Sequence, residues 1–306
     1  MAIGAVYVPL LQIIKIILKN WGLIENAGGT SGQESIIYFV RFPRIMVAVF
    51  VGAGLATSGA VMQGIFRNPM AEPGIIGVSS GAGLGAVIAI SLGLTAKSLY
   101  FLPVFASVGA LIAASAVVII STKGGKIPTL TLILAGIAIS TFIGSITSIL
   151  LTRISDHQVR VHLFWTMGGL SDRRWEHFRL CAIPITICMI LLFTFGRDLN
   201  VMLLGEEEAQ SVGLDSSRTR KILLILTSIV TAAAVSVSGS ISFVGLIVPH
   251  IMRMLVGPDH RVLLPASALG GAIFLVACDM ISRVIIMPRE IGVGIVTSLL
   301  GAPYFL

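Results

Sequence analysis

Long apolar runs dominate this sequence and limit its possible folds more than any other feature. A membrane-spanning α-helix needs about 20 predominantly apolar residues, whereas a membrane β-barrel shows short alternating segments. The runs here are long and unbroken, and they predict an all-α fold, a polytopic transmembrane helix bundle of about nine spans. They cover residues 45–65, 75–94, 99–120, 129–151, 180–195, 222–238, 241–256, 262–282 and 291–306.

Charged residues are scarce, which supports the same conclusion. Asp, Glu, Lys and Arg make up 11% of the 306 residues, against about 25% in a soluble domain, and hydrophobic types reach 56%. These proportions exclude a soluble globular domain and a disordered chain. The net charge is +7, but the basic residues stand singly or in pairs between apolar runs, so no nucleic-acid partner is expected.

No sequence pattern indicates a catalytic, metal or cofactor site. Cys181, Cys188 and Cys278 lie inside apolar runs without metal-ligand spacing, so we expect them to be packing residues. The five histidines include no His-x-x-x-His pair. The phosphate-binding loop G-x-x-x-x-G-K-[ST] is also absent from the sequence, so the chain is not expected to bind ATP by that route.

Two segments are less regular than the other runs. Residues 222–256 are too long for one span and break at Ser238-Gly239-Ser240, which predicts two helices with a tight or partly re-entrant connection. Residues 1–18 are interrupted by Pro9 and Lys15, so this segment is either a weak tenth span or a piece that lies at the membrane interface.

Small residues recur at every fourth position in three of the runs. This spacing lets helix backbones approach closely in lipid, so we predict a tightly packed bundle. The hydroxyl groups in the third stripe could instead face a water-filled path. The stripes are Gly52, Ala56, Ala60 and Gly64; Gly77, Gly81, Gly85 and Ala89; and Gly136, Ser140, Gly144 and Ser148.

The distribution of charge does not decide the orientation in the membrane. If alternate connections share a side, nine Lys and Arg residues lie on one side and twelve on the other, so the positive-inside rule has no clear answer.

Asp279 is the only acidic residue deep inside an apolar run. Because Arg283 follows it at i+4 on the same helix, we expect an ion pair between them.

Several long motifs occur in a characteristic order along the chain. They include R-F-P-R at 41–44, F-R-N-P-M-A-E-P-G-I-I-G-V-S-S-G-A-G at 66–83, W-T-M-G-G-L-S at 165–171, and I-S-F-V-G-L-I-V-P-H-I-M-R at 241–253. With these motifs the chain resembles, over essentially its whole length, the FecCD-like family of ABC importer permeases. That family takes up cobalamin, iron–siderophores, haem and related metal chelates.

The resemblance implies a single permease domain over residues 1–306 and an architecture of ten spans with both ends in the cytoplasm. Most of the family's first span and the end of its last span have no counterpart here, so we expect about nine spans and an N-terminus on the outer side. Gly292 stands where the family usually has proline, which leaves the local kink open. The implied location is the bacterial cytoplasmic (inner) membrane.

The resemblance also implies sites for two partners. Arg41, Arg44 and Arg283 match outer-face arginines that hold acidic residues of a soluble periplasmic or lipid-anchored binding protein, and an Arg fork suits a carboxylate. On the inner side, a short helix would lie in a groove of a partner ATPase, with its acidic residues at the N-terminus and a glycine at its end. Its residues are Gly205, Glu206, Glu207, Glu208, Ala209 and Gly213.

Residues that gate and line the pathway are implied in the same way. Asn68, Pro69 and Met70 follow the second family span and would help close the inner end, where Pro69 breaks the helix. The alternative for these residues is a simple tight turn. The helix that opens with Thr129 and Thr131 would line the pathway at the twofold axis of a permease dimer, with Gly136, Ser140 and Gly144 along it.

We therefore expect the permease subunit of an ATP-driven importer for a metal chelate, which has no catalytic activity and no cofactor of its own. Two partner ATPases would hydrolyse ATP, and a second permease copy or a paralogue would complete the pathway. Iron–siderophore uptake is the first choice because it is the commonest role in the family, followed by cobalamin and then haem. The rival from another class is an ATP-independent secondary transporter, which would need coupling carboxylates or Na⁺-binding broken helices.

Overall fold

The computed structural model describes residues 8–25, 28, 30–286 and 289–305, and these residues fold almost entirely into helices. Within the described residues, β-structure is limited to one isolated bridge between Lys123 and Lys126. The predicted all-α bundle is therefore confirmed. Six helices are long and apolar enough to cross a membrane: Ser31–Phe66, which comprises α2, the π-helix η1 and α3, then α5 (Phe101–Ser121), α6 (Thr129–Leu151), α8 (Trp175–Thr194), α11 (Ser216–Ser238) and α13 (His260–Val284).

Three further apolar helices are shorter: α4 (Val78–Ser91), α12 (Val244–Val256), and α14 (Val293–Gly301) continued by the 3₁₀-helix η4 (Ala302–Phe305). Each predicted apolar run thus forms a helix, six as clear spans and three as shorter apolar helices. A helix of 13 or 14 residues is about 20 Å long, less than the thickness of the hydrocarbon core.

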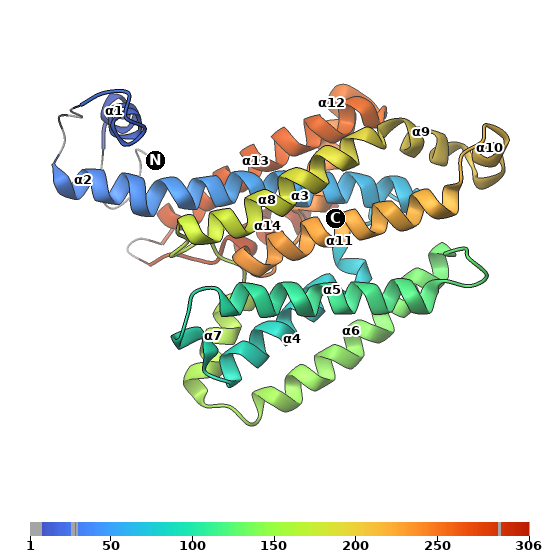
Figure 1. Cartoon of the computed structure of the whole chain (residues 1–306), viewed down its shortest axis with the longest axis horizontal. Coiled ribbons are helices and arrows are strands. Elements are labelled where there is room, and N and C mark those ends of the chain that lie inside the picture. The colour runs from blue at the N-terminus through green and yellow to red at the C-terminus, as the bar shows by residue number, and fades with distance from the viewer. Residues whose placement is uncertain (1–7, 26–27, 29, 287–288, 306) are drawn as a thin grey trace.

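The helices form two layers that meet along α5 and α11 (Figure 1). One layer is built around α3 (Phe42–Phe66), which packs against α8, α11, α12 and α13. The other holds α4, α5 and α6, with α4 packed along α5. Short helices close the two ends of the bundle: α7 (Asp156–Thr166) at one end, and α9 (Gly196–Leu204) and α10 (Glu206–Ser211) at the other.

The small-residue stripes lie at helix crossings, as predicted. A Cβ atom on Gly52 of α3 would overlap the carbonyl oxygen of Gly271 in α13. Equally, a Cβ atom on Gly271 would overlap the carbonyl oxygen of Gly52. Gly81 of α4 and Gly109 of α5 approach each other in the same way. These backbones touch because no side chain separates them, which is how helices associate tightly in lipid.

The break after Ser238 is also confirmed. α11 ends there, and α12 begins after Phe243, which has a positive φ of 70°. Between them, a Cβ on Gly239 would overlap the carbonyl oxygen of Trp165. The irregular segment 239–243 therefore packs against the end of α7 instead of facing lipid.

The first described helix, α1 (Leu10–Asn20), is amphipathic and has 11 residues, too few for a span. Ile13 and Ile16 are buried against Val8 and Ile37, which joins α1 to the start of η1. Of the two alternatives for this segment, the short helix fits an interfacial piece. The expectation about the N-terminus itself falls on residues 1–7, outside the described residues.

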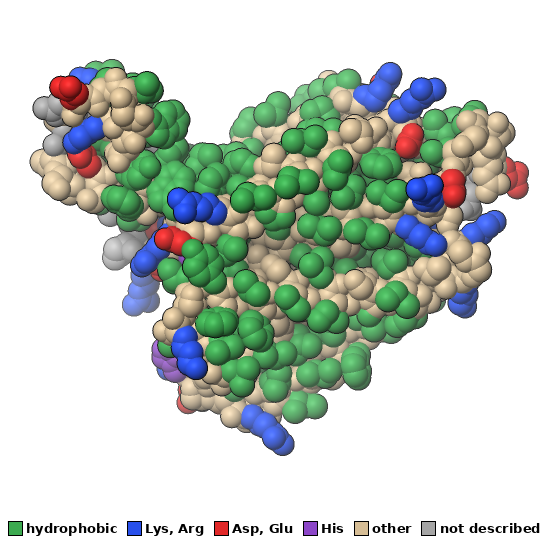
Figure 2. Space-filling model, viewed as in Figure 1, with side chains coloured by type: hydrophobic (Ala, Val, Ile, Leu, Met, Phe, Trp, Pro, Cys, Tyr) green, Lys and Arg blue, Asp and Glu red, His purple; other side chains and the backbone are tan. Residues whose placement is uncertain are grey.

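Hydrophobic side chains cover the visible face over the middle of the bundle, and Lys, Arg, Asp and Glu gather toward its two ends (Figure 2). This banded surface matches a multi-pass membrane protein, whose apolar middle lies in lipid and whose charged ends lie in water.

Candidate functional site

Charged and irregular segments gather at the two ends of the helix bundle. The α7 end holds η1 (Ile36–Arg41), α7, the loop 167–174 and the segment 289–292 before α14. The α10 end holds the loop 67–72, α9 and α10. The residues singled out by the sequence divide between these two ends and the face of α6.

A buried ion-pair cluster lies at the α7 end. Arg44 at the start of α3 contacts Asp279 of α13, with 2.8 Å between Nη2 and Oδ1, and also Glu290, with 2.8 Å between Nη1 and Oε2. Arg283 reaches the other oxygen of Asp279 at 3.2 Å, which confirms the i+4 pair expected from the sequence. Ser171 donates a hydrogen bond of 2.8 Å to Glu290. The cluster thus joins α3 and α13 to the loop 167–174 and the segment 289–292.

This arrangement differs from an exposed row of arginines. The side chains of Arg44 and Arg283 are 9% and 10% exposed, and both contact acidic groups of their own chain. Arg41 is 8% exposed in the last turn of η1. The structure therefore brings the three arginines to the same end of the bundle. Arg44 and Arg283 point inward, because both contact the buried carboxylate of Asp279 in α13.

Glu290 is the cluster member that lies nearest to solvent, with a side chain 38% exposed. Its partial burial alone would raise the pKa of its carboxyl group. The hydrogen bond from Ser171 and the positive charges of Arg44 and Arg283 outweigh that effect and hold the pKa below its usual value. Glu290 is thus ionised at neutral pH and fixes the segment 289–292 to Arg44. Sequence spacing offered no signal for this contact, since Glu290 lies 246 residues from Arg44.

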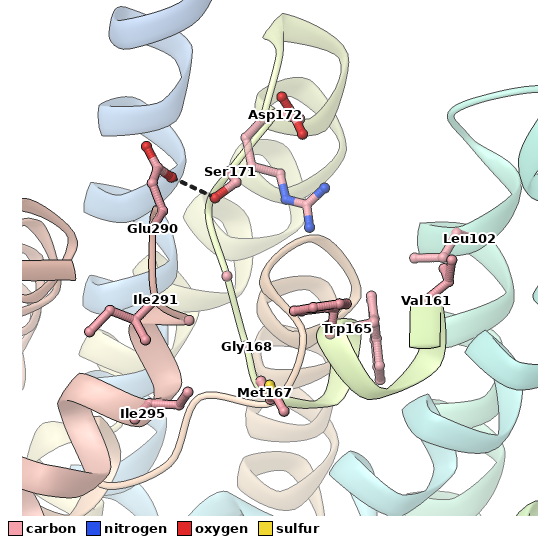
Figure 3. A pocket seen from close by; sticks show the side chains of 14 residues that line it. Leu102, Val161, Trp165, Met167, Gly168, Ser171, Asp172, Glu290, Ile291 and Ile295 are labelled. Atoms are coloured by element: carbon pink, nitrogen blue, oxygen red, sulfur yellow. Dashed lines mark hydrogen bonds between the residues drawn. The ribbon is translucent and has the colours of Figure 1, made fainter. Parts of the chain in front are cut away.

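A cavity of about 510 Å³ lies beside this cluster, between the end of α7 and the segment 289–292 (Figure 3). Trp165 and Met167 line it from the end of α7, Ile291 and Ile295 line it from the other wall, and the bonded pair of Ser171 and Glu290 closes one side.

Arg173 also lines this cavity, and its environment is unusual for an arginine. Burial lowers the pKa of Arg173 to about 10; Asp172 opposes this shift and Arg44 adds to it. Asp172 has a positive φ of 56°, a backbone conformation that a non-glycine residue rarely adopts. The buried Nε of Arg173 and the buried Nε1 of Trp165 have no hydrogen-bond partner among the described residues.

The predicted short helix is present at the α10 end. α10 begins at Glu206, directly after Gly205, and Gly213 follows it with a positive φ of 85°. Ala209 is fully buried against the bundle, whereas Glu207 and Glu208 are exposed. The helix therefore presents acidic side chains outward from a fixed base.

Apolar side chains surround α10 and are also exposed. Leu204 at the end of α9 is 70% exposed, and Val212 just after α10 is 67% exposed. An exposed apolar surface bordered by charged groups is typical of an interaction site.

Asn68, Pro69 and Met70 form an exposed turn after α3 at this same end. The side chain of Asn68 accepts a hydrogen bond of 2.9 Å from the backbone N–H of Met70, which stabilises the turn. All three residues are exposed within the single chain. Burial begins only at Ala71, which is 1% exposed.

Glu72 follows this turn, and no role was predicted for it from the sequence. Burial raises the pKa of Glu72, and a hydrogen bond with the backbone of Phe243 partly offsets the shift. The carboxyl group thus connects the end of α3 to the break between α11 and α12.

The predicted pathway helix, α6, is half packed and half open. Thr129 and Thr131 lie in its first turn. A Cβ on Gly136 would overlap the carbonyl oxygen of Ile75, and Ser140 lies near Gly77, so this part of the stripe packs inside the chain. A Cβ on Gly144, in contrast, would have no heavy atom within 4 Å.

The hydroxyl groups beyond Gly136 lie on the open side of α6. Thr141, Ser145 and Ser148 are exposed, and each donates a hydrogen bond to the carbonyl four residues earlier. Large apolar side chains share this side of the helix, among them Phe142 at 64% exposure and Ile149 at 60%. α6 therefore presents a mixed polar and apolar face that no described residue covers.

Within the described residues, no group of three or more His, Cys, Asp or Glu side chains is placed to hold a metal ion. The three cysteines are buried and unpaired, as expected of packing residues.

Comparisons with known proteins identify the family. A family model described as the FecCD transport family matches residues 1–306. The cobalamin import system permease protein BtuC of Halobacterium salinarum is 47% identical over 300 residues, which are 97% of this chain and 78% of that protein. The hemin transport system permease protein HmuU of Yersinia pestis is 43% identical over 307 residues, which are 97% of this chain and 92% of that protein.

The fold has a close counterpart among solved structures. An inward-facing structure of a metal-chelate type ABC transporter matches with a TM-score of 0.84 and 36% sequence identity, covering 97% of this chain and 95% of that one. With a family model that matches the whole chain and relatives that match nearly all of it, the chain belongs to the FecCD transport family.

Proposed function

We propose that this chain is the permease subunit of an ATP-driven ABC importer that moves a metal chelate across the cytoplasmic (inner) membrane. The observation that carries the proposal is the whole-chain similarity to two importer permeases and to a metal-chelate type ABC transporter. The chain itself would perform no chemistry, and its helices would alternate between outward-open and inward-open arrangements.

The α10 end is the proposed contact for two ATPase subunits. Gly205, Glu206, Glu207, Glu208, Ala209 and Gly213 define the proposed coupling element. Buried Ala209 anchors α10 to the bundle, while exposed Glu207 and Glu208 and the apolar side chains beside them are free to enter a groove. A rigidly mounted helix is what can transmit ATPase closure to α9 and α11.

The α7 end is the proposed contact for a soluble binding protein, with Arg41, Arg44 and Arg283 as the docking arginines. Because Arg44 already holds Glu290, an acidic group of the partner would have to compete with that carboxylate. Docking would then release Glu290 and the segment 289–292 from Arg44. This competition would couple arrival of the partner to movement at the outer end of the pathway.

The open face of α6 is the proposed contact for a second permease copy or a paralogue. Thr129, Thr131, Gly136, Ser140 and Gly144 lie along this helix, with Asn68, Pro69 and Met70 as the proposed inner gate. In a dimer the hydroxyl groups of Thr141 and Ser145 would line a hydrated path, while the apolar side chains would pack against the partner. Gly144, with no neighbour inside its own chain, would lie at that interface.

The proposal leaves open which metal chelate the importer carries. Frequency within the family favours an iron–siderophore, whereas the names of the two relatives favour cobalamin and haem. A chelate-stimulated ATPase assay of the reconstituted complex, with its own ATPase and binding protein, separates these chelates. We expect one chelate to stimulate hydrolysis well above the level without substrate. If the chain does not assemble with an ATPase, the proposal is wrong.

A further inference from the structure

A groove of about 830 Å³ opens at the α7 end, away from the ion-pair cluster. One wall comes from Trp21 and the residues Tyr38–Val40 of η1, and the other comes from the first turns of α8. None of the residues assigned to docking, coupling or the pathway lines this groove.

Aromatic rings build and stiffen the groove. The rings of Tyr38 and Trp175 lie 5.5 Å apart, and Phe42 packs edge-to-face on Trp175 at 5.3 Å. The indole N–H of Trp175 donates a hydrogen bond of 3.0 Å to the backbone oxygen of Tyr38. This bond fixes the start of α8 to η1. Trp and Tyr side chains concentrate where a membrane meets water, because their rings are apolar and their polar atoms reach the interface.

Two arginines face the same groove. Arg174 and Arg179 are exposed, and neither lies within salt-bridge distance of an acidic side chain among the described residues. Glu176 also lines the groove. Two positive charges and one negative charge leave the groove with a net positive charge, which suits a phosphate group.

Below the arginines, α8 carries an apolar stripe that faces outward. Ile183, Ile187 and Ile190 lie on the same face of α8 as Arg179 and are 62%, 55% and 58% exposed. On the other side of the groove, Phe39 is 60% exposed. The groove therefore opens sideways onto the apolar outer surface of the bundle. The start of α8 carries the two arginines, and the rest of this face of α8 carries apolar side chains.

The amphipathic helix α1 extends this surface. In Figure 1, α1 is seen nearly end-on while α3 runs across the view, so α1 lies across the direction of the spans. Leu10, Leu11 and Ile14 on its outer face are 68%, 67% and 48% exposed. A helix in this orientation with an exposed apolar face is typical of one that rests in the membrane interface.

We propose that this groove is a binding site for one phospholipid. The lipid phosphate contacts Arg174 and Arg179, the aromatic rings enclose the headgroup region, and the acyl chains extend along Phe39 and the isoleucine stripe of α8. A docking protein fits less well, because the groove continues into a surface of isoleucine that a water-soluble partner would not reach inside a membrane. The site requires only that the chain spans a membrane and does not depend on the proposed transport.

The test uses the full chain in nanodiscs that contain phosphatidylglycerol. Native mass spectrometry after release of the protein counts the lipids that stay bound. Wild-type protein should retain phosphatidylglycerol through the groove, and the R174Q/R179Q variant should retain it at least about tenfold more weakly. The matched control is R153Q/R160Q, which removes two exposed arginines near α7 that do not line the groove. This control should retain lipid like the wild type.

A second readout distinguishes a lipid from a bare anion. Phosphatidylglycerol with brominated acyl chains should quench the fluorescence of Trp21 and Trp175 in the wild type, and R174Q/R179Q should reduce the quenching. Inorganic phosphate should neither displace the retained lipid nor prevent quenching. Equal lipid retention by wild type and R174Q/R179Q, an equal loss in R153Q/R160Q, or displacement by inorganic phosphate would each overturn the proposal. So would a loss of binding-protein affinity in R174Q/R179Q with lipid retention unchanged.

Discussion

Arg44 and Asp279 form an ion pair of 2.8 Å between side chains that are 9% and 1% exposed, although 235 residues separate them in the sequence. The pair joins the start of α3 to the last turns of α13. Because Arg283 shares the same carboxylate and Glu290 shares the same guanidinium, four charges stabilise one another in a buried environment. This cluster is the main electrostatic link at the α7 end.

Removing the carboxylate of Asp279 should destabilise the protein strongly. Asp279→Asn leaves the buried guanidinium of Arg44 without its one fully buried ion-pair partner of the two in the cluster, and breaking a buried pair in this way typically costs about 3–5 kcal/mol. Thermal unfolding of the detergent-solubilised protein measures the loss. The double variant Arg44→Met/Asp279→Leu, which removes both charges, should be more stable than Asp279→Asn. If Asp279→Asn unfolds at the wild-type temperature, the pair does not have the stabilising role assigned to it.

Bulk added at the crossing of α3 and α13 should separate these helices. A valine at Gly52 would push against the carbonyl of Gly271, and overpacking of this kind costs about 1–3 kcal/mol or more. Gly83→Val in α4 is the matched control, because a Cβ at this site would have no described heavy atom within 4 Å. We expect Gly52→Val to lower the yield of folded protein and Gly83→Val to preserve it. Comparable folding of the two variants would contradict the packing described here.

Acid should weaken the attachment of Glu290 and the segment 289–292 to Arg44. The pKa of Glu290 is lower in the folded protein than in the unfolded chain, so its contribution to stability is present above the unfolded pKa and is lost as the pH falls through the folded pKa. The melting temperature of the wild type should therefore fall more steeply than that of Glu290→Gln between about pH 5 and pH 3. Parallel pH profiles for the two proteins would show that Glu290 is not held in the ion-pair cluster.

Charge reversal on α10 should weaken the proposed contact with the ATPase. Glu207→Lys changes an exposed side chain of this helix and should leave the fold intact, since Ala209 provides the buried contact. Co-purification with the partner ATPase should decrease several-fold. Glu25→Lys makes the same change at an exposed position next to α1 and should have no effect on co-purification. An equal effect of both variants would mean that overall charge, and not α10, controls the association.

The sequence predicted the helices well because apolar runs directly reflect burial in lipid. It did not predict how short α4, α12 and α14 are: the apolar run of α4, for example, begins with Ile75 and Ile76, which the fold places in a 3₁₀ turn. Helix ends of this kind depend on packing against neighbours, which periodicity does not record.

The candidate site was predictable only where its contacts are local. Asp279 and Arg283 are four residues apart on one helix, so their pair could be foreseen. The contacts of Arg44 with Asp279 and Glu290 join distant segments, and no spacing rule connects them. The same holds for Arg173, whose burial depends on how the loop 167–174 folds beside Asp172.

ATP-dependent uptake by the purified complex tests the central claim most directly. The chain, its ATPase and its binding protein are reconstituted in liposomes, and accumulation of cobalamin, haem or a ferric siderophore is followed with and without ATP. The account predicts accumulation of one of these chelates only when ATP can be hydrolysed, with no response to an imposed proton or Na⁺ gradient. Accumulation driven by such a gradient in the absence of ATP would contradict it.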